Sequence, residues 1–383
     1  MAKLGELYKI TSGGTPSRTH SEYYEDGTIP WVKTGDLKDK YLFETDEKIS
    51  QLGLENSSAR IYLKNTVLLA MYGATIGATS ILKIDAATNQ ACAAFSPRED
   101  TLPEYLYAFL ESQKDKFIKD AVGGAQPNLS AGYLKTIEFK LPSLEQQTRI
   151  TRNLSKIDEL LLLRKQQLAK LDELVKARFV EMFGEPVQNP NCWKTENLLD
   201  LGYCKNGMNF HRDDCGTEIH CLGVGDFKNH STIRDVGSLP FISLNELPTS
   251  EYLLQDGDIV FVRSNGNKEL VGRCLAIYPA KIPVTYSGFC IRYRLTSNKI
   301  TVSYLLRVLK ADSVRKKMTG RGANIQNLNQ QILAQLVVPI PPLSLQNQFA
   351  AFVERVDQQK QTIQQSLEKL ELMKKALMQE YFG

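Results

Sequence analysis

The sequence repeats itself at a distance of 199 residues. Phe183-Gly184 in "EMFGE" precedes Phe382-Gly383 in "EYFG" by that interval (383 − 184 = 199). The same shift superposes two further pairs of segments without a gap: "GGAQPNLS" at 123–130 on "GANIQNLN" at 322–329, and "KLPSLEQQ" at 140–147 on "PIPPLSLQ" at 339–346. A repeat of this length predicts a duplicated architecture, so every local motif has to be interpreted together with its copy.

Each copy contains one long amphipathic stretch with heptad spacing. Ser143-Leu144-Glu145-Gln146 has the form of a capping box, which predicts a helix start. Beyond it, positions spaced alternately by three and four residues run over four heptads and recur 199 residues later. The apolar seam residues predicted to form the interface are Leu154, Ile157, Leu161, Leu168, Leu171 and Val175, and Val353, Val356, Ile363, Leu367, Leu370 and Leu377.

Basic residues interrupt both seams, and we expect their aliphatic stems to follow the seam while their charged heads reach solvent. These are Arg164 and Arg178 in the first seam, and Lys360 and Lys374 in the second. Two seams in one chain can pair with each other, and the intervening domain favours an antiparallel pair with an approximate two-fold axis. The alternative is that each helix packs only on its own domain.

The remaining sequence divides into two α+β regions. Residues 1–142 and 185–341 each contain short β-like runs, Gly-rich turns and one helical patch, which predicts two compact α+β domains. Weaker echoes link them: "TGDLK" at 34–38 with "VGDFK" at 224–228, and "NTVLLAMYG" at 65–73 with "GDIVFVRSN" at 257–265. The helices are expected at 143–184 and 342–383, as an antiparallel coiled coil separating the two domains.

Composition constrains function only weakly. The formal net charge is +4, less than a stand-alone nucleic-acid binder usually carries. No apolar run approaches the ~18 residues of a membrane span, and the start lacks a secretory signal, so we expect a cytoplasmic protein.

Three stretches that could suggest a metal or nucleotide site lack a required residue or spacing. His211, Cys215, His220 and Cys221 are zinc-ligand types but lack paired knuckle spacing, so no metal is expected. "GVGDFK" at 223–228 lacks the third glycine of a dinucleotide fingerprint, and "SGGTPS" at 12–17 is no phosphate-binding loop. Because no catalytic constellation is found, we expect a protein that is not an enzyme and holds no cofactor.

The alternation of domain, long helix, domain and long helix resembles the specificity subunit of type I restriction-modification systems. The likeness rests on "LPSLEQQTRI" at 141–150, its degenerate copy "IPPLSLQNQF" at 340–349, and the two "FG" endings. "YGATIG" at 72–77 with "TNQA" at 88–91, and "RSNGNKELVGR" at 263–273, are similar to the core of that family's target-recognition domains.

The resemblance implies a non-catalytic DNA-binding subunit. Each recognition domain would read one half of a bipartite site in double-stranded DNA, while the helices set the spacer and bind two methyltransferase subunits. S-adenosylmethionine would be carried by those subunits, and ATP with Mg²⁺ by restriction subunits. Two alternatives remain: a coiled-coil scaffold whose domains bind proteins, and a methyltransferase with its own recognition domains, for which cofactor and catalytic motifs are missing.

Gly-rich and amide-rich loops supply the candidate DNA contacts, because backbone N–H groups approach phosphates while Asn, Gln and Arg read base edges. Any single residue could equally serve a turn or a cap; the matching positions in both domains favour contact. The first-domain candidates are Ser12, Gly14, Thr15, Arg18, Trp31, Lys33, Thr34, Tyr72, Gly73, Thr75, Asn89, Gln90, Gln126 and Asn128. The second-domain candidates are Asn206, Asn209, Lys228, Arg263, Ser264, Asn265, Asn267, Lys268, Arg321, Asn324, Gln326 and Asn327.

Overall fold

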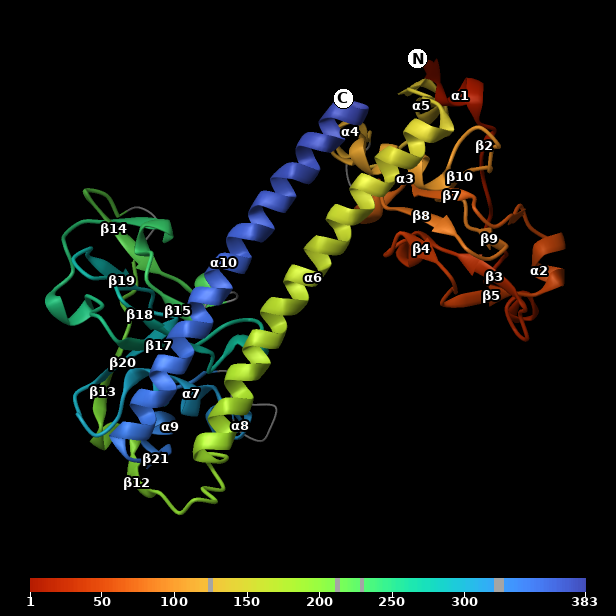
Figure 1. Cartoon of the computed structure of the whole chain (residues 1–383). Helices are drawn as coiled ribbons and strands as arrows, with labels where there is room; N and C mark the ends of the chain where they lie inside the picture. The colour runs from red at the N-terminus through yellow and green to blue at the C-terminus, as the bar shows by residue number, and fades with distance from the viewer. Residues whose placement is uncertain (123–126, 211–213, 228–230, 320–326) are drawn as a thin grey trace. The chain divides into compact units, whose positions relative to one another are not determined.

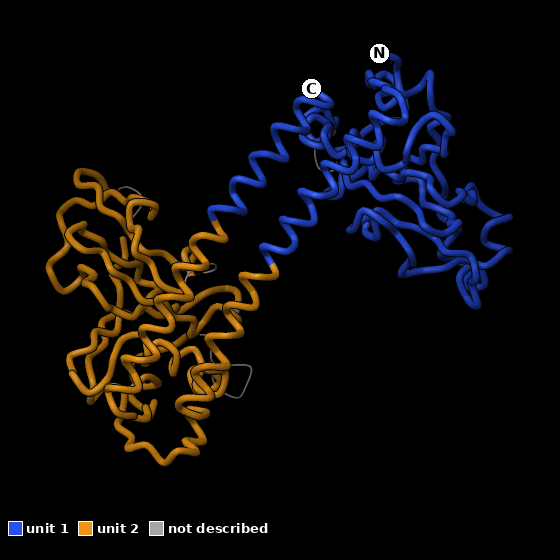
Figure 2. The backbone as a smooth tube through the Cα atoms, in the orientation of Figure 1, with its two compact units in different colours: residues 1–165, 365–383 blue, residues 166–364 orange. Residues whose placement is uncertain are grey.

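The chain forms two compact units that do not coincide with its two halves. The computed structural model describes all residues except 123–126, 211–213, 228–230 and 320–326. Unit 1 contains residues 1–165 and 365–383, and unit 2 contains residues 166–364 (Figure 2). The long helices α6 (Leu144–Phe183) and α10 (Leu343–Phe382) each contribute to both units. Neither helix therefore forms a compact body of its own.

Unit 1 is built on two sheets and a short β-pair (Figure 1). The five-stranded sheet has the order β2-β10-β7-β8-β4 (Ile10–Ser12, Cys92–Phe95, Val67–Ala70, Thr79–Leu82, Tyr41–Leu42). The four-stranded sheet is β5-β3-β9-β6 (Glu47–Ile49, Ile29–Val32, Ala86–Thr88, Ile61–Tyr62), and β1 (Ala2–Lys3) pairs with β11 (Glu138–Phe139). The helices are α1 (Leu4–Leu7), α2 (Gln51–Glu55), α3 (Pro103–Ser112), α4 (Lys114–Asp120) and α5 (Ala131–Thr136).

Unit 2 repeats this plan. Its five-stranded sheet is β13-β20-β17-β18-β15 (Gly202–Asn206, Cys290–Leu295, Asp258–Val262, Cys274–Ile277, Thr232–Ile233). A three-stranded sheet is β16-β14-β19 (Phe241–Leu244, Thr217–Leu222, Val284–Tyr286), and β12 (Lys194–Asn197) pairs with β21 (Val337–Ile340). The shorter helices are α7 (Val302–Lys310), α8 (Asp312–Thr319) and α9 (Gln330–Ala334). The predicted α+β class and internal repeat are confirmed.

Both sequence echoes mark structurally equivalent positions. The "GD" segments form the 3₁₀ turns η2 (Thr34–Asp36) and η5 (Val224–Phe227). In each turn the aspartate accepts the backbone N–H three residues before it, Asp36 from Lys33 and Asp226 from Gly223, both at 2.8 Å. The other echo marks β7 and β17, which occupy the centre of the two five-stranded sheets.

A buried glutamine joins the start of each long helix to its domain. Gln147 and Gln346 are both 0% exposed. The Gln147 side chain accepts from Leu102 N (2.8 Å) and donates to the carbonyls of Asp100 and Pro142 (2.9 Å each). Gln346 does the same, accepting from Thr301 N (2.7 Å) and donating to the carbonyls of Lys299 (3.0 Å) and Pro341 (2.8 Å). These bonds satisfy backbone groups that would otherwise be left without partners where two segments meet.

The repeated "FG" ends each long helix in the aromatic core of the other copy's domain. Phe183, at the end of α6, lies in unit 2, with its ring 4.7 Å from Tyr304 and 5.6 Å from Phe349. Phe382, at the end of α10, lies in unit 1, with its ring 5.5 Å from Tyr105 and 6.0 Å from Phe109. Tyr105 and Tyr304 are themselves separated by 199 residues.

The helices pair antiparallel within each unit, as predicted. All predicted seam positions are buried or half-buried. In unit 1 Lys374 pairs with Asp158 (2.6 Å), and in unit 2 Lys360 pairs with Asp172, so residue numbers fall on α10 as they rise on α6. This excludes helices that pack only on their own domains.

Both lysines of the second seam end in ion pairs with exposed aspartates. The Lys360 and Lys374 side chains are 22% and 35% exposed, and each head reaches a carboxylate on the other helix, on Asp172 (56% exposed) and Asp158 (44% exposed). The stems therefore follow the seam while the charged heads lie at its edge, where an opposite charge attracts each ammonium group. In the first seam, Arg178 pairs with Glu181 of its own helix (2.9 Å). No helix in the described ranges is both long and apolar enough to cross a membrane.

Candidate nucleic-acid interface

In unit 1 the predicted loops meet where β3 and β9 end. Gly14 N donates to Thr88 O and Asn89 N donates to Val32 O, both at 2.9 Å. Thr15 Oγ1 donates to Gln90 Oε1 at 2.6 Å. The loops at 12–18, 33–36 and 89–90 are therefore brought together by main-chain and side-chain hydrogen bonds.

A short main-chain ladder adds the other candidates of unit 1. Met71 N donates to Ala91 O (2.8 Å), and Leu129 N donates to Met71 O (2.9 Å). Tyr72 and Asn128 form a β-bridge, and the Tyr72 side chain is 42% exposed. Gly73 has a φ of +68°, which non-glycine residues rarely adopt. We call this set of loops (12–18, 33–36, 72–75, 89–91 and 128) the unit 1 loop cluster.

Two cations of the unit 1 loop cluster share one carboxylate. Glu47, on β5, accepts from Arg18 Nη2 (2.6 Å) and from Lys33 Nζ (2.5 Å). The Arg18 guanidinium also lies over the Tyr24 ring, 4.2 Å from its centroid. The hydrogen bond from Lys33, followed by that from Arg18, lowers the pKa of the Glu47 carboxyl. Both cations are thus held in defined positions on the loop surface.

Unit 2 repeats the ladder with different side chains. Arg263 N donates to Phe289 O and Leu328 N donates to Arg263 O, both at 2.8 Å, and Ser264 forms a β-bridge with Asn327. Met208 N donates to Tyr286 O (3.3 Å), which brings in the loop after β13. The unit 2 loop cluster therefore comprises 206–209, 263–267, 287–289 and 327. Arg263 occupies the place of Met71, which is 3% exposed, so a core residue in one copy is a half-buried cation in the other.

Some predicted residues support the loops rather than lie on their surface. Trp31 is 2% exposed and donates from Nε1 to Gly14 O (3.1 Å), and Gly14 is buried. A Cβ at Gly14 would lie 2.0 Å from Ser58 Oγ, so glycine is needed there for close packing. Asn89 and Asn267 use their side-chain oxygens to accept Ala91 N (3.1 Å) and Glu269 N (3.0 Å), which are turn-capping roles.

Other predicted residues have different surroundings. Thr75 Oγ1 donates to Tyr72 O (3.1 Å), Asn265 accepts Asn267 N (2.8 Å), and Asn206 accepts from Gln330 Nε2 (3.5 Å). Ser12 and Thr34 are half-buried, at the end of β2 and in η2. Exposed side chains at the loop surface are those of Thr15, Arg18, Tyr72, Gln90, Asn128, Asn209, Asn267 and Asn327. Gln126, Lys228, Arg321, Asn324, Gln326 and the Lys268 side chain lie outside the described residues.

The sequence interpretation missed two functional candidates. Phe289 is 60% exposed in the unit 2 loop cluster, beside Arg263. Phe289 follows Gln90 by 199 residues, so carrying Asn89-Gln90 across the repeat would have found it. Glu47 had no such signal, because its role depends on two cations that are distant in sequence.

The zinc-ligand types do not converge in the described part of the chain. No group of three or more His, Cys, Asp or Glu side chains suited to a metal occurs there. His220 Nδ1 lies 2.8 Å from Leu239 O, and its ring centroid lies 3.9 Å from that of Phe241 at an interplanar angle of 30°. Cys221 is buried, and His211 is outside the described residues.

The family model and the relatives with similar sequences indicate the same protein family. The family model "Type I restriction modification DNA specificity domain" matches residues 1–173 and 218–372. The MjaIX specificity subunit of a type I restriction enzyme from Methanocaldococcus jannaschii is 27% identical, over 92% of this chain and 85% of that protein. The StySPI specificity subunit from Salmonella potsdam is 25% identical, over 88% and 76%.

Solved structures agree in fold. The type I restriction-modification S subunit from M. genitalium superposes with a TM-score of 0.55 at 15% identity, covering 100% of this chain and 95% of that one. A chain from a study of complex assembly and conformational transition in a type I system superposes with a TM-score of 0.64 at 16% identity, covering 100% and 96%.

Proposed function

Because the chain belongs to the type I restriction modification DNA specificity family, we propose that it is the DNA-recognition subunit of such a system. Each loop cluster reads one half of a bipartite target in double-stranded DNA. The observation that carries this proposal is the duplicated ladder: Tyr72–Asn128 and Ser264–Asn327 hold equivalent loops, yet those loops present different side chains. Two domains of the same fold that present different side chains to DNA suit a target whose two half-sites differ in sequence.

The side chains of the two loop clusters have the chemistry for this task. Asn and Gln side chains such as Gln90 and Asn128 can pair with adenine edges, and Arg263 can pair with guanine. Arg18 and Lys33 are suited to phosphates, which fix position without carrying sequence information. Phe289 offers an exposed ring for apolar contact with a base or sugar.

The long helices are suited to bind the methyltransferase subunits. Large apolar side chains remain exposed on α6 and α10 away from their seam: Leu160, Leu162, Leu163, Leu174, Val180, Leu372 and Met373, each between 43% and 68% exposed. Burying such side chains favours association, at ~25 cal/mol per Å² of apolar surface. S-adenosylmethionine is carried by these partners, and ATP with Mg²⁺ by restriction subunits.

Replacing residues 185–341 by the equivalent domain of a related subunit should change one half of the recognised sequence only. The reason is that the unit 2 loop cluster is formed entirely within that segment. Methylation mapped across the genome of a host carrying the chimaera with its partner subunits tests this. Changes in both halves would reject independent readers, and a scaffold without DNA-binding function would give no methylation pattern that depends on this chain.

Arg263→Ala should weaken binding to the cognate site by ~1–3 kcal/mol and relax base preference within one half-site. The guanidinium follows β17 directly and is held near Gly288 O, at 3.4 Å from Nη1. Binding would be measured by competition between cognate and substituted duplexes at fixed salt. Lys281→Ala, which removes an exposed cation at the other end of the sheet, is the control. Equal weakening on all sequences would make Arg263 a phosphate contact instead.

The isolated chain should transfer no methyl group from labelled S-adenosylmethionine to DNA. Among the described residues the loop clusters hold hydrogen-bonding and cationic groups but no assembled acid, base or nucleophile set. Transfer should begin only when a methyltransferase subunit is added. Activity of the chain alone, purified free of partners, would contradict this assignment.

A further inference from the structure

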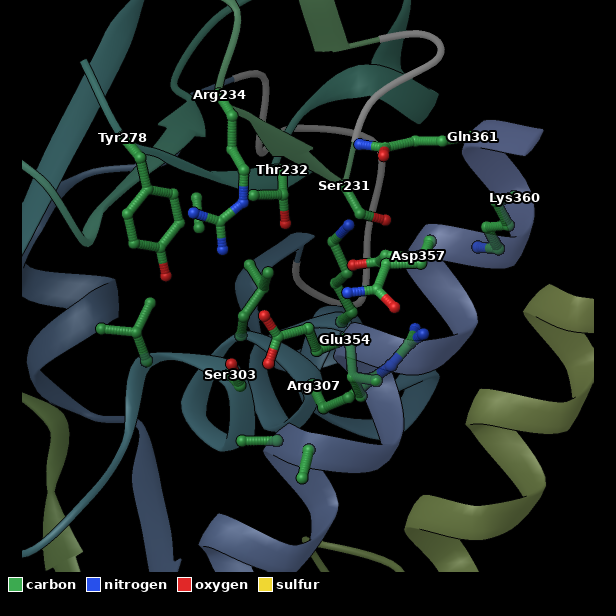
Figure 3. Close-up of a pocket in the computed structure, with 18 of the residues that line it drawn as sticks. Ser231, Thr232, Arg234, Tyr278, Ser303, Arg307, Glu354, Asp357, Lys360 and Gln361 are labelled. Atoms are coloured by element: carbon green, nitrogen blue, oxygen red, sulfur yellow. The ribbon is translucent and has the colours of Figure 1, made fainter. Parts of the chain in front are cut away.

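Unit 2 contains a polar groove that the loop clusters do not use. It has a volume of about 630 Å³ and lies between α7, the first part of α10 and the ends of β15 and β18 (Figure 3). Arg234 and Tyr278 line one side, Arg307 and Lys310 come from α7, and Asp357 comes from α10. We call this the unit 2 groove.

The same groove exists in unit 1, where it has a volume of only about 30 Å³. The positions correspond through the repeat: Ala108 and Glu111 of α3 precede Arg307 and Lys310 of α7 by 199 residues. Both grooves also lie beside a short parallel edge strand, β4 on β8 in unit 1 and β15 on β18 in unit 2. We call the first copy the unit 1 groove.

Internal charge pairs close the unit 1 groove. Lys83 lies 4.6 Å from the centroid of the Tyr41 ring and 3.5 Å from the Glu104 carboxylate. Lys374 pairs with Asp158 at 2.6 Å. Lys40 fills the remaining space, donating to Ser155 Oγ at 3.3 Å. Every cation here therefore has a polar partner within its own unit.

The unit 2 groove has the opposite balance. A cation again lies over an aromatic ring, with Arg234 4.3 Å from the Tyr278 centroid, but cation and ring have exchanged strands. Ser303 replaces Glu104, Lys310 replaces Glu111 and Arg307 replaces Ala108, while Glu354 replaces Ser155. At these four positions the unit 2 groove has one carboxylate fewer and two cations more. Among the described residues, none of the three cations Arg234, Arg307 and Lys310 forms a salt bridge.

Burying the charged side chains of Arg307 and Lys310 costs free energy unless an anion lies close to them. Burial is the main cause of the lowered pKa of Arg307 and of Lys310, whose protonated forms are desolvated in the groove wall. Two carboxylates of α10, Glu354 and Asp357, also line the groove, and burial raises the pKa of Asp357. An external carboxylate entering the groove would compensate part of the desolvation of both cations.

The unit 2 groove lies away from the unit 2 loop cluster. Tyr278 follows β18, whose last residue Ile277 pairs with Asp258 at the start of β17, whereas Arg263 follows the end of β17. The length of β17, five residues, separates the two sites by ~15 Å along the sheet. A ligand in the groove is therefore distinct from the bases read by the loops.

We propose that the unit 2 groove docks an acidic segment of a methyltransferase subunit, and that the unit 1 groove does not. This inference rests on the proposed function, because it assigns one contact of that partner. The two partner positions on this chain are consequently unequal: one has an added electrostatic contact, and the other depends on the helices alone.

The test is the mass and affinity of the complex with purified methyltransferase subunit, measured by native mass spectrometry and sedimentation at low and high salt. The double variant Arg234→Glu/Lys310→Glu gives the groove acidic groups, and Glu is already present at the position of Lys310 in unit 1. It should bind one copy as the unmodified chain does and the second at least tenfold more weakly. Arg234→Gln, at an exposed position, should give a smaller loss in the same copy.

Phe43→Glu is the matched control, because Phe43 occupies the position of Arg234 in unit 1 and is 67% exposed. It should retain both copies with unchanged affinity. Retention of both copies by the double variant, equal weakening of both, or weakened DNA binding by that variant without partner would each overturn the docking proposal. If the unmodified chain bound DNA but no methyltransferase subunit, the proposed function and the docking contact would both fail.

Discussion

Deleting one heptad from each long helix should shorten the spacer of the DNA target by at most ~3 base pairs while both half-sites keep their bases. The deletions are Leu161–Gln167 in α6 and Lys360–Ser366 in α10. Each removes ~10 Å of helix at 1.5 Å per residue, and one base pair spans ~3.4 Å. The seams stay in phase because whole heptads are lost, and the loop clusters are untouched. Methylation mapping in a host with the partner subunits would report the new spacer.

The control is a deletion of two residues from each helix. It would rotate the seam by ~200° and expose its apolar side to solvent, so we expect loss of folded protein rather than a new spacer. If the heptad variant were folded and active on the original spacer, the helices would not be the element that determines the distance.

Gln346→Leu should lower the free energy of unfolding by about 3 kcal/mol, because one buried N–H and two carbonyls lose their partner while side-chain volume is nearly kept. Gln147→Leu should have the same effect on unit 1. Since a chain with two units need not unfold in one step, hydrogen exchange at individual amides is the measurement. Thr301 N–H should lose protection in Gln346→Leu only, and Leu102 N–H in Gln147→Leu only.

Gln166→Leu, at an exposed position of α6, provides the control and should change neither amide. Unchanged exchange in both buried variants would mean that water replaces the amide group at no cost. Loss of protection at both amides in a single variant would instead show that the two helix starts are coupled.

The sequence is sufficient to predict the features that depend on periodicity. The heptad seam and the 199-residue repeat are defined by the spacing of residues along the chain, so the paired helices and duplicated domains can be predicted from the sequence alone. The Ser143 helix start is predictable for the same reason, because a cap needs only neighbours: Gln146 N donates to Ser143 Oγ at 3.4 Å. The "GD" echo likewise locates two equivalent turns, since each is stabilised by a residue three positions away.

Features that combine distant segments are not predictable in this way. That Glu47 joins Arg18 to Lys33 depends on how β5 lies beside the first loops. The pairing of Lys374 with Asp158 depends on the register of two helices more than 200 residues apart, and simple periodicity does not specify which side chains face each other. The unequal grooves also combine distant segments, because the pairs Lys83–Glu104 and Lys374–Asp158 close only the unit 1 copy. Aromatic residues suit a DNA-facing loop surface, yet the indole of Trp31 fills the space beneath that surface.

The exchange of helix ends has a consequence for the order in which the chain matures. Translation of unit 1 starts first, with residues 1–165. Its second segment, residues 365–383, which brings Phe382 to Tyr105, is translated only after all of residues 166–364. During synthesis the first domain therefore has an open aromatic core, while unit 2 is continuous in the chain and can close as it is made. The domain at the start of the chain is thus the last to be completed, and a polypeptide interrupted before α10 would leave that domain's aromatic core open to solvent.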